Sequence, residues 1–323
     1  MSRVLFRSPN WLGDAVMATA VPPALRRRHE TVGILTPAAI ADVWRAAPDV
    51  DEVVTFSPGG EVDAYRSAGY DRVLLGPVSF GSAWRALRGG VRERFGFGGE
   101  CRDWLLSRRL PARAYSRDRH QVENYRELAG LAGRPEDADA PRLVPLADWR
   151  QDVPAIWPDA RRPRVALQPG ATYGPAKRWP ADRFAAVGRA LHERGLDVAV
   201  LGGPGDRAEV EAVLASAPDA LDLGGRTTVG QLAAVLESAD LLVTNDTGPM
   251  HLAAAVGTPV LAVFGSTSPR WTRPFGEGHR VITHPVPCQP CFRRDCRIGY
   301  GCLRGVETER VVAEVLAVTE ALA

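Results

Sequence analysis

Lysine is almost absent from this chain: 40 residues are lysine or arginine, and Lys177 is the one lysine. Arginine is a planar fork of five donors, whereas lysine is a compact charge on a flexible stem that suits a single phosphate oxygen. Lys177 follows the apolar run Val165–Leu167 and precedes a helix-like segment. We therefore expect Lys177 to contact a phosphate. The alternative is a solvated surface lysine retained by chance.

Long apolar runs are also missing. No run approaches the roughly 18 residues of a membrane-spanning helix, and the first residues, MSRVLFR, do not resemble a signal peptide. We expect a cytoplasmic protein whose five cysteines are reduced unless they hold a metal. The net charge of +2 carries no nucleic-acid signature, so no nucleic-acid partner is expected.

Two nucleotide-binding motifs are absent as well. The loop over residues 8–15, SPNWLGDA, contains neither GxGxxG nor GxxxxGK[ST], which argues against a dinucleotide-type motif and against a P-loop. No pair of acidic residues suited to binding a metal ion lies near this loop or near the loops over residues 168–180 and 243–251, which are considered below. We therefore expect catalysis without Mg²⁺ and without any other required cofactor.

The chain is too long for one core, and its apolar runs alternate with helix-like segments. This pattern is typical of two parallel, doubly wound α/β sheets. We predict domains over residues 1–150 and 164–323, a linker over residues 151–163, and a terminal helix over residues 307–322. The predicted strands are Val4–Phe6, Val32–Leu35, Val53–Val54, Val73–Leu75, Arg164–Gln168, Asp197–Leu201, Leu221–Leu223, Leu241–Val243 and Val260–Phe264.

The loop after Leu241–Val243 is the stronger candidate for a ligand site, because open α/β sheets bind ligands at the carboxyl ends of their strands. A helix begins after this loop, so Thr247 and Gly248 are expected to present backbone N–H groups to an anion. Asp246 either accepts hydrogen bonds from sugar hydroxyls or caps the helix. His251, one turn further on, either contacts the same anion or is structural.

The loop between the first strand and the first helix is the second candidate. Gly13 permits a close approach of a ligand to the backbone. Asp14 stands at the predicted helix start, where it either caps the helix or acts as a general base that takes a proton from a hydroxyl nucleophile. The residue pattern alone leaves both roles open.

Four of the five cysteines lie close together in the sequence, at Cys288, Cys291, Cys296 and Cys302. Such a group could hold Zn²⁺ or an Fe–S cluster, although the spacing lacks the paired CxxC units of zinc ribbons. A structural metal at these four residues is one interpretation. Free thiols in a local loop are the other.

Three segments together make the chain resemble the ADP-heptose:lipopolysaccharide heptosyltransferases, glycosyltransferase family 9. They are PNWLGDAVM at residues 9–17, PGA at 169–171 with KRWP at 177–180, and NDTGPMHL at 245–252. The resemblance spans nearly the whole chain and looks closest to the type II enzymes of inner-core assembly. It implies a GT-B fold of two Rossmann-like domains facing across a cleft. The N-terminal domain would bind a lipid-linked acceptor and the C-terminal domain the ADP-sugar.

The resemblance also implies roles for single residues in an inverting transfer of heptose from ADP-L-glycero-D-manno-heptose to the heptosyl-Kdo inner core of lipopolysaccharide. Asp14 matches the general base, and Lys177 matches the lysine that contacts the diphosphate. A lysine charge and helix-terminus N–H groups suit this chemistry, because negative charge builds on the leaving ADP. The remaining positions that match the donor site are Gly13, Thr172, Tyr173, Asp246, Thr247, Gly248 and His251. Tyr173 departs from the small hydroxyl residue of some relatives.

An arginine-rich stretch offers a surface for the acceptor. Between Arg85 and Arg126 the chain has eleven arginines and five acidic residues. We predict that this stretch contacts anionic groups of the lipopolysaccharide core, with peripheral contact to the cytoplasmic face of the inner membrane; a solvated arginine-rich face is the alternative. The candidate residues are Arg92, Arg94, Arg102, Arg117, Arg119 and His120.

Two other functions remain open from the sequence. The chain could be another GT-B nucleotide-sugar transferase or an epimerase, although the acidic and histidine groups that an epimerase needs around the sugar C2 cannot be placed. It could also be a non-catalytic nucleotide-binding relative. The presence of both Asp14 and Lys177 argues against that last function.

Overall fold

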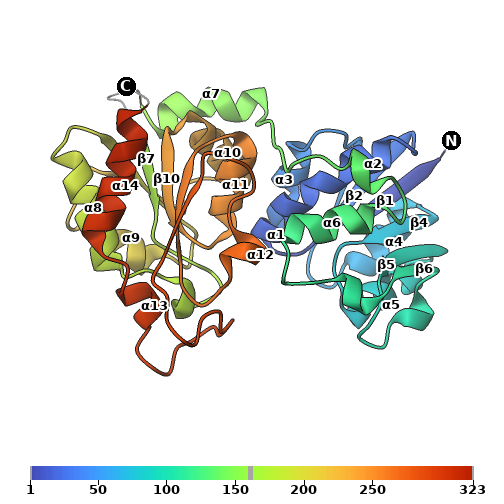
Figure 1. The fold of residues 1–323 in the computed structure, drawn as a ribbon. Helices are drawn as coiled ribbons and strands as arrows, with labels where there is room; N and C mark the ends of the chain where they lie inside the picture. Colours follow the sequence, from blue (N-terminus) through green and yellow to red (C-terminus); the bar gives the residue numbers. More distant parts are fainter. Residues whose placement is uncertain (1, 159–162, 322–323) are drawn as a thin grey trace. The chain divides into compact units, whose positions relative to one another are not determined.

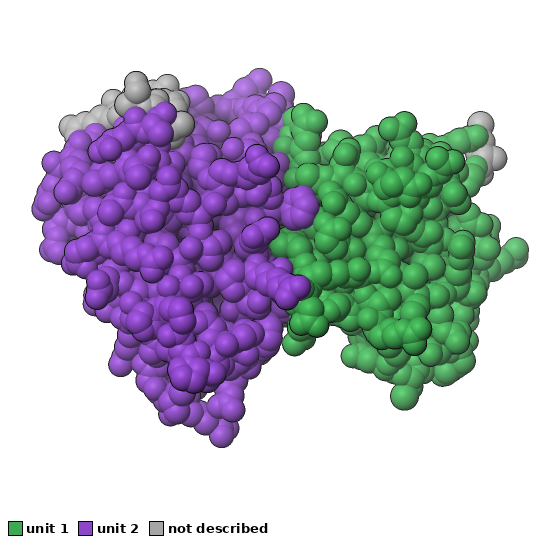
Figure 2. All heavy atoms as spheres, in the orientation of Figure 1, with its two compact units in different colours: residues 1–144 green, residues 145–323 purple. Residues whose placement is uncertain are grey.

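The computed structural model describes residues 2–158 and 163–321. The chain forms two compact units, residues 1–144 and residues 145–323, which Figure 2 shows in different colours. In the part of the chain that the structure describes, no helix combines the length and the apolar character needed to cross a membrane.

The first unit is built on a parallel sheet of six strands in the order β3-β2-β1-β4-β5-β6 (Figure 1). The chain adds β2 and β3 on one side of β1 and then returns to place β4 on the other side. The loops after β1 and β4 therefore flank the switch point, where sheets of this kind bind ligands. The strands are β1 (Arg3–Arg7), β2 (Thr31–Pro37), β3 (Glu52–Phe56), β4 (Arg72–Leu75), β5 (Glu93–Phe97) and β6 (Arg108–Leu110).

Short helices surround this sheet. One group consists of α4 and α5, which pack on each other, and another consists of α1, α2 and α6. The helices are α1 (Leu12–Met17), α2 (Val21–Arg26), α3 (Ala41–Arg45), α4 (Glu61–Ala68), α5 (Phe80–Arg88) and α6 (Gln121–Ala129), with the 3-10 turns η1 (Ala18–Ala20), η2 (Ala38–Ile40), η3 (Asp103–Leu105), η4 (Ala112–Ala114) and η5 (Pro135–Asp137).

The second unit repeats the plan with the strand order β12-β11-β10-β7-β8-β9, again all parallel. Its switch point lies between the adjacent strands β7 and β10. Every residue of β7, β10 and β11 is buried, which explains why these strands read as unbroken apolar runs. The strands are β7 (Arg164–Gln168), β8 (Asp197–Gly202), β9 (Leu221–Gly224), β10 (Leu241–Asn245), β11 (Val260–Phe264) and β12 (Arg280–Thr283).

The helices of this unit form two groups by their contacts: α8 packs on α9 and α14, and α10 packs on α7 and α11. They are α7 (Ala147–Ile156), α8 (Ala181–His192), α9 (Arg207–Leu214), α10 (Val229–Ser238), α11 (Gly248–Val256), α12 (Pro269–Thr272), α13 (Gly301–Arg304) and α14 (Thr308–Glu320), with the 3-10 turn η6 (Pro175–Lys177).

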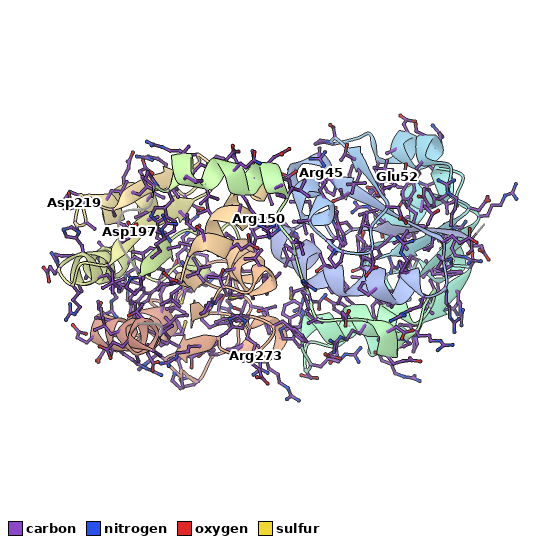
Figure 3. All side chains as sticks on the ribbon, turned by 90° about the horizontal axis from the view of Figure 1, so that it is seen from above. Arg45, Glu52, Arg150, Asp197, Asp219 and Arg273 are labelled. Atoms are coloured by element: carbon purple, nitrogen blue, oxygen red, sulfur yellow. The ribbon has the colours of Figure 1, made fainter. Side chains whose placement is uncertain are left out.

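The helix α7 overlaps the segment interpreted as a linker, residues 151–163, and starts four residues before it. Arg150 of α7 pairs with Glu237 of α10 through two nitrogen–oxygen distances of 2.6 Å, and Trp157 just after the helix donates to Asp197 of β8 at 3.0 Å. Figure 3 labels Arg150 and Asp197 among the side chains. These contacts attach α7 to the second unit.

The predicted fold class, two parallel doubly wound sheets, is confirmed. The predicted first helix is interrupted, because Pro22 and Pro23 start a new helix, α2, after the turn η1. The strands β5, β6 and β12 and the helices α4 to α7, α12 and α13 were not predicted from the sequence. Of the predicted terminal helix, Leu322 lies outside the described residues.

Candidate functional site

Lys177 ends the loop that follows β7. The chain turns at Gly174, which has φ of +143°, and a Cβ atom there would lie 2.7 Å from the carbonyl oxygen of Arg294. A side chain is therefore excluded at this position by both the backbone conformation and the close neighbour. The turn η6 then ends at Lys177.

Lys177 forms an ion pair with Asp246 across the switch point. Its Nζ lies 2.6 Å from Oδ2 of Asp246, with 14% of the lysine side chain and 3% of the aspartate side chain exposed. The two residues meet because β7 and β10 are neighbouring parallel strands whose loops leave the same edge of the sheet. An ammonium group has three donors, so one contact with Asp246 leaves capacity for an anion at the accessible side of Lys177.

Two threonines complete the surroundings of the Asp246 carboxylate. Thr267 donates to Oδ2 of Asp246 at 2.5 Å, and Thr272 donates to the same oxygen at 3.4 Å. Both follow β11, the next strand of the sheet. Neither threonine was predicted from the sequence, although the residues GSTS at 265–268, directly after a buried strand, indicate a polar loop at this edge.

Asn245, the last residue of β10, joins the two loops. Its fully buried side chain donates from Nδ2 to the carbonyl oxygen of Pro169 at 2.7 Å, and its Oδ1 accepts from the backbone N–H of Trp179 at 2.9 Å. One amide therefore holds both ends of the loop that carries Lys177. Asn245 belongs to the segment NDTGPMHL that carries part of the family resemblance, but no role was predicted for it.

The helix α11 starts beside this ion pair. Gly248 is its first residue, and no side chain caps its N-terminus. Thr247 and Gly248 are partly exposed, so this end of the helix can offer backbone N–H groups to an anion. His251 is only 5% exposed, which favours its structural interpretation.

The cysteine-rich segment, residues 288–302, supports the Lys177 loop. Tyr173 donates its hydroxyl to the carbonyl oxygen of Phe292 at 2.6 Å, and Arg294 donates to the carbonyl oxygen of Tyr173 at 2.8 Å. The ring centroid of Tyr173 lies 5.0 Å from Nζ of Lys177, within the range of a cation–π contact. Thr172, in the same loop, is exposed.

The predicted metal site at Cys288, Cys291, Cys296 and Cys302 is not supported. All four are free thiols, and the described residues contain no group of three or more His, Cys, Asp or Glu side chains arranged to hold a metal ion. Hydrogen bonds from the backbone N–H groups of Ile298 and Tyr300 lower the pKa of Cys296. Burial raises the pKa of Cys302, and the neighbouring thiolates raise it further.

Asp14 lies in the first turn of α1. The loop before this helix, which starts at Ser8, is held in place by the buried side chain of Arg7, the last residue of β1. Arg7 donates to Oδ1 of Asn10 at 2.8 Å and to both carboxylate oxygens of Glu61, at 2.8 and 3.1 Å. Ser8 accepts a hydrogen bond from the indole of Trp44 at 2.9 Å. The polar loop at this switch point is therefore fixed by contacts within the core.

Two tyrosines stand beside Asp14. Burial raises the pKa of Tyr115 and of Tyr125, and the charge of Asp14 raises both further. Both phenols therefore stay protonated around neutral pH and can donate hydrogen bonds next to the carboxylate. The sequence analysis did not identify them, because they lie about a hundred residues downstream of Asp14.

The six candidate residues of the arginine-rich stretch lie in different places in the first unit. Arg117, Arg119 and His120 follow β6, at the carboxyl edge of the sheet where Asp14 also lies. His120 accepts from the backbone N–H of Val122 at 3.2 Å and caps α6, while Arg119 donates to Oδ1 of Asn124 at 2.8 Å and pairs with Glu127. Arg117 is exposed.

Of the other three arginines, two lie at the opposite edge of the sheet, and Arg102 is buried at the carboxyl ends of β4 and β5. Arg92 and Arg94 lie at the amino end of β5, and Arg94 donates to the carbonyl oxygen of Leu105 at 2.6 Å. Arg102 is fully buried and donates to the carbonyl oxygens of Phe97 and Pro77 at 2.8 and 2.7 Å. The guanidinium of Arg102 ties the loops after β4 and β5 together, and Arg92 and Arg94 lie at the edge opposite to Asp14. The structure adds no support for an acceptor role at these three positions, and that role stays a prediction.

Comparisons with known proteins agree with this geometry. The chain is 29% identical to lipopolysaccharide heptosyltransferase 2 of Escherichia coli, over 98% of each chain, and 27% identical to lipooligosaccharide heptosyltransferase 2 of Haemophilus influenzae, over 86% of this chain and 88% of the relative. The solved structure of E. coli ADP-heptose lps heptosyltransferase II superposes with a TM-score of 0.84 at 27% identity over 99% of each chain.

The fold of an E. coli heptosyltransferase solved with ADP is also similar, with a TM-score of 0.75 at 18% identity over 98% of this chain and 99% of the other. Residues 63–300 match the profile of glycosyltransferase family 9 (heptosyltransferase). The match covers more than half of the chain and includes Lys177, Asp246 and the helix α11. This protein is therefore a glycosyltransferase and belongs to glycosyltransferase family 9.

Proposed function

We propose that this enzyme transfers heptose from ADP-heptose to the heptosyl-Kdo inner core of lipopolysaccharide, with inversion at the anomeric carbon. The observation that carries this proposal is the contact between Lys177 and Asp246 at the switch point of the second unit, 2.6 Å long, beside the uncapped start of α11. Family membership and the named relatives supply the donor and the acceptor class.

In the proposed reaction the second unit stabilises the leaving ADP. As the glycosyl–oxygen bond breaks, its electron pair moves to the diphosphate, and the ammonium of Lys177 and the N–H groups of Thr247 and Gly248 stabilise the added negative charge. Asp246 orients Lys177 and accepts from the sugar hydroxyls, and Thr172 and Tyr173 border the same donor site. These groups provide the positive field without a metal, so we propose that none is required.

Asp14 activates the acceptor in the proposed reaction. Its carboxylate takes the proton from the attacking hydroxyl of the acceptor as the new glycosidic bond forms. Tyr115 and Tyr125, which both hydrogen-bond to the side chain of Gln121, stay protonated near this carboxylate. Gly13 leaves room for a substrate to approach the backbone, and the acceptor's anionic groups contact Arg117, Arg119 and His120.

The test is ADP release from ADP-heptose in the presence of a heptosyl-Kdo-lipid acceptor. We expect Asp14→Asn to lower turnover at least ~100-fold, the usual contribution of a general base, while ADP-heptose binding persists. The exposed Asp63→Asn is the matched control and should retain turnover. Equal rates for wild type and Asp14→Asn would refute the assignment of the base, and equal turnover with UDP-glucose would refute the donor. EDTA should leave the rate unchanged.

We also propose that the first unit makes peripheral contact with an anionic membrane, as expected if its acceptor is lipid-linked. Phe80, Trp84 and Trp104 are 38%, 40% and 68% exposed. The ring centroid of Phe80 lies 6.2 Å from that of Trp84 and 6.3 Å from that of Trp104, so the three rings form one patch. The helix α5 carries two arginines and no acidic residue. Aromatic rings beside basic residues suit the interface of a bilayer with anionic headgroups.

This contact is tested by sedimentation with vesicles of phosphatidylethanolamine and phosphatidylglycerol. The double variant Trp84→Ser/Trp104→Ser should bind these vesicles more weakly than wild type. Ile298→Ser, which removes another large exposed hydrophobic side chain, 74% exposed in the second unit, should not change binding. If the double variant instead binds vesicles normally but shows a higher KM for a soluble, lipid-free acceptor oligosaccharide, the patch binds sugar and not membrane.

A further inference from the structure

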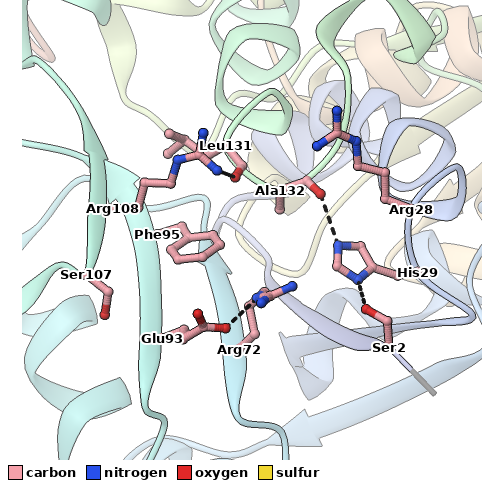
Figure 4. A pocket seen from close by; sticks show the side chains of 10 residues that line it. All are labelled: Ser2, Arg28, His29, Arg72, Glu93, Phe95, Ser107, Arg108, Leu131 and Ala132. Carbon is pink, nitrogen blue, oxygen red and sulfur yellow. Dashed lines mark hydrogen bonds and ion pairs between the residues drawn. The ribbon is translucent and has the colours of Figure 1, made fainter.

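A hollow of about 450 Å³ opens at the amino edge of the first unit's sheet, the edge opposite to the Asp14 loop. Residues from the starts of four strands and from the ends of α2 and α6 form its wall (Figure 4). Its volume lies in the range of small-molecule sites, roughly 300–1,000 Å³. The lining residues are Ser2, Arg28, His29, Arg72, Glu93, Phe95, Ser107, Arg108, Leu131 and Ala132.

Positive charge in this hollow exceeds negative charge. Three of the lining residues are arginines and one is a glutamate. Arg72 pairs with Glu93 at 2.6 Å, and Arg108 donates to the carbonyl oxygen of Leu131 at 2.9 Å. Among the described residues, neither Arg28 nor Arg108 forms an ion pair with a carboxylate. Two guanidinium groups therefore face the hollow with their charge uncompensated.

A neutral histidine forms the inner wall. His29 is 5% exposed, with Nε2 3.0 Å from the carbonyl oxygen of Ala132 and Nδ1 2.7 Å from the hydroxyl of Ser2 (Figure 4). Because a carbonyl can only accept, Nε2 carries the hydrogen and Nδ1 accepts from Ser2. Burial lowers the pKa of His29, and the charges of Arg72 and Arg28 lower it further. The imidazole thus adds no charge of its own at neutral pH.

The remaining wall suits the uncharged part of a small ligand. The ring of Phe95 is 7% exposed, and the guanidinium of Arg72 lies 5.6 Å from its centroid. The hydroxyls of Ser2 and Ser107 provide further hydrogen-bonding groups at the rim. An apolar ring, two hydroxyl oxygens that can still accept a hydrogen bond and two guanidinium groups without a carboxylate partner together match a compact polar molecule that carries a dianion.

We propose that this hollow is a second ligand site, which binds a phosphate monoester through Arg28 and Arg108. The phosphate belongs either to a soluble phosphorylated sugar or to a lipid headgroup, since both present the same dianion. Guanidinium groups bind phosphate oxygens with charge-assisted hydrogen bonds. The site lies at the edge of the sheet that the transfer reaction does not use, so it is independent of the proposed function.

The test measures binding of glucose 6-phosphate by calorimetry at low salt. All proteins carry Lys177→Gln, so that the donor site contributes no phosphate binding. We expect Arg28→Gln/Arg108→Gln to weaken binding about tenfold or more, as for the loss of hydrogen bonds to a charged group. Arg28→Gln alone removes an exposed side chain that has no ion pair with any residue the structure describes, and it should weaken binding without affecting folding. The matched control is Arg27→Gln, an exposed neighbour outside the hollow, which should bind as the parent does.

Histidine NMR provides a second readout. A bound dianion favours the protonated imidazole, so glucose 6-phosphate should shift the resonances of His29 and raise its pKa. A parallel experiment uses vesicles of phosphatidylcholine with and without phosphatidic acid. If Arg28→Gln/Arg108→Gln loses only its binding of glucose 6-phosphate, the ligand is a soluble phosphate. If the double variant loses only its binding of the vesicles with phosphatidic acid, the ligand is a lipid headgroup. Unchanged binding in both experiments, or an equal loss with Arg27→Gln, overturns the proposal.

Discussion

At the scale of single residues, the chemistry of the second unit depends on the shape of one cation. The Nζ atom of Lys177 fits between Oδ2 of Asp246, 2.6 Å away, and the ring of Tyr173, with its centroid 5.0 Å away. A guanidinium is larger and planar and directs its donors differently. Retaining the positive charge is therefore not sufficient to retain the geometry.

We expect Lys177→Arg to lower kcat about tenfold or more, because the arginine cannot keep the contact with Asp246 and also direct a donor at the diphosphate. Steady-state kinetics with ADP-heptose checks this. The reverse change at an exposed position, Arg189→Lys on α8, is the control and should leave kcat unaltered. A wild-type kcat for Lys177→Arg would show that only the charge at this position matters.

The cysteines provide a second prediction at this scale. The lowered pKa of Cys296, caused by the N–H groups of Ile298 and Tyr300, gives it a larger thiolate fraction than Cys302, whose pKa burial raises. Iodoacetamide at neutral pH should therefore modify Cys296 severalfold faster than Cys302 in the intact protein. Peptide mass mapping over time measures both rates. Equal rates, or faster modification of Cys302, would contradict the assigned contacts.

At the scale of elements, the buried contacts of Arg7 connect β1 to the helices α4 and α5. Glu61 of α4 is 4% exposed and accepts from Arg7 of β1 and, at 2.7 Å, from Arg85 of α5. Removing Glu61 leaves the guanidinium of Arg7 buried without its carboxylate. Breaking a buried pair in this way costs more than the pair itself contributes to stability.

We expect Glu61→Ala to lower the free energy of unfolding by about 3–5 kcal/mol, measured by urea denaturation. Asp63→Ala, in the same first turn of α4, is the matched control. Asp63 pairs with Arg66 at 2.8 Å, but its side chain is 77% exposed, so its loss should cost less than about 1 kcal/mol. Similar losses for the two variants would show that the Arg7 contacts contribute little.

Burial explains part of the predictability of the strands, since the partly buried edge strands β3 and β9 were also predicted. The central strands were predictable because β7, β10 and β11 are buried along their whole length and read as apolar runs. In contrast, β6 and β12 are edge strands, and both start with arginine. Their side chains face water in part, so no apolar run marks them.

The candidate site could be predicted only in part, for a related reason. The loop motifs identify Asp14, Lys177 and Asp246 as polar residues after buried strands. The pairing of Lys177 with Asp246 depends on which strands are neighbours, and the hydrogen bonds that Thr267 donates to Asp246 and Tyr173 donates to Phe292 join segments far apart in the chain. No local pattern encodes such contacts.

At the scale of the whole molecule, each unit contains a histidine whose lowered pKa makes the folded state less stable in acid. Burial lowers the pKa of His29 in the first unit and of His279 in the second below the ordinary value of 6.5. The unfolded chain therefore binds protons that the folded chain does not, and stability is complete above about pH 6.5 and falls as the pH drops below it.

Urea midpoints measured from pH 8 to pH 5 should consequently decrease as the solution becomes more acidic. Each histidine contributes a slope of at most about 1.4 kcal/mol per pH unit to the free energy of unfolding. His29→Asn should flatten the decrease for the first unit and His279→Asn the decrease for the second. A pH dependence that persists unchanged in both variants would place the responsible groups elsewhere.

The pairing of Lys177 with Asp246 also has a kinetic consequence. Before any ligand binds, the lysine and its carboxylate partner form an electrically neutral pair, so this pair adds little long-range attraction for the diphosphate of the proposed donor. In the proposed reaction Lys177 therefore adds little to the electrostatic steering of the nucleotide-sugar. The positive charge acts at short range, once the diphosphate has reached the start of α11 and shares the ammonium with Asp246.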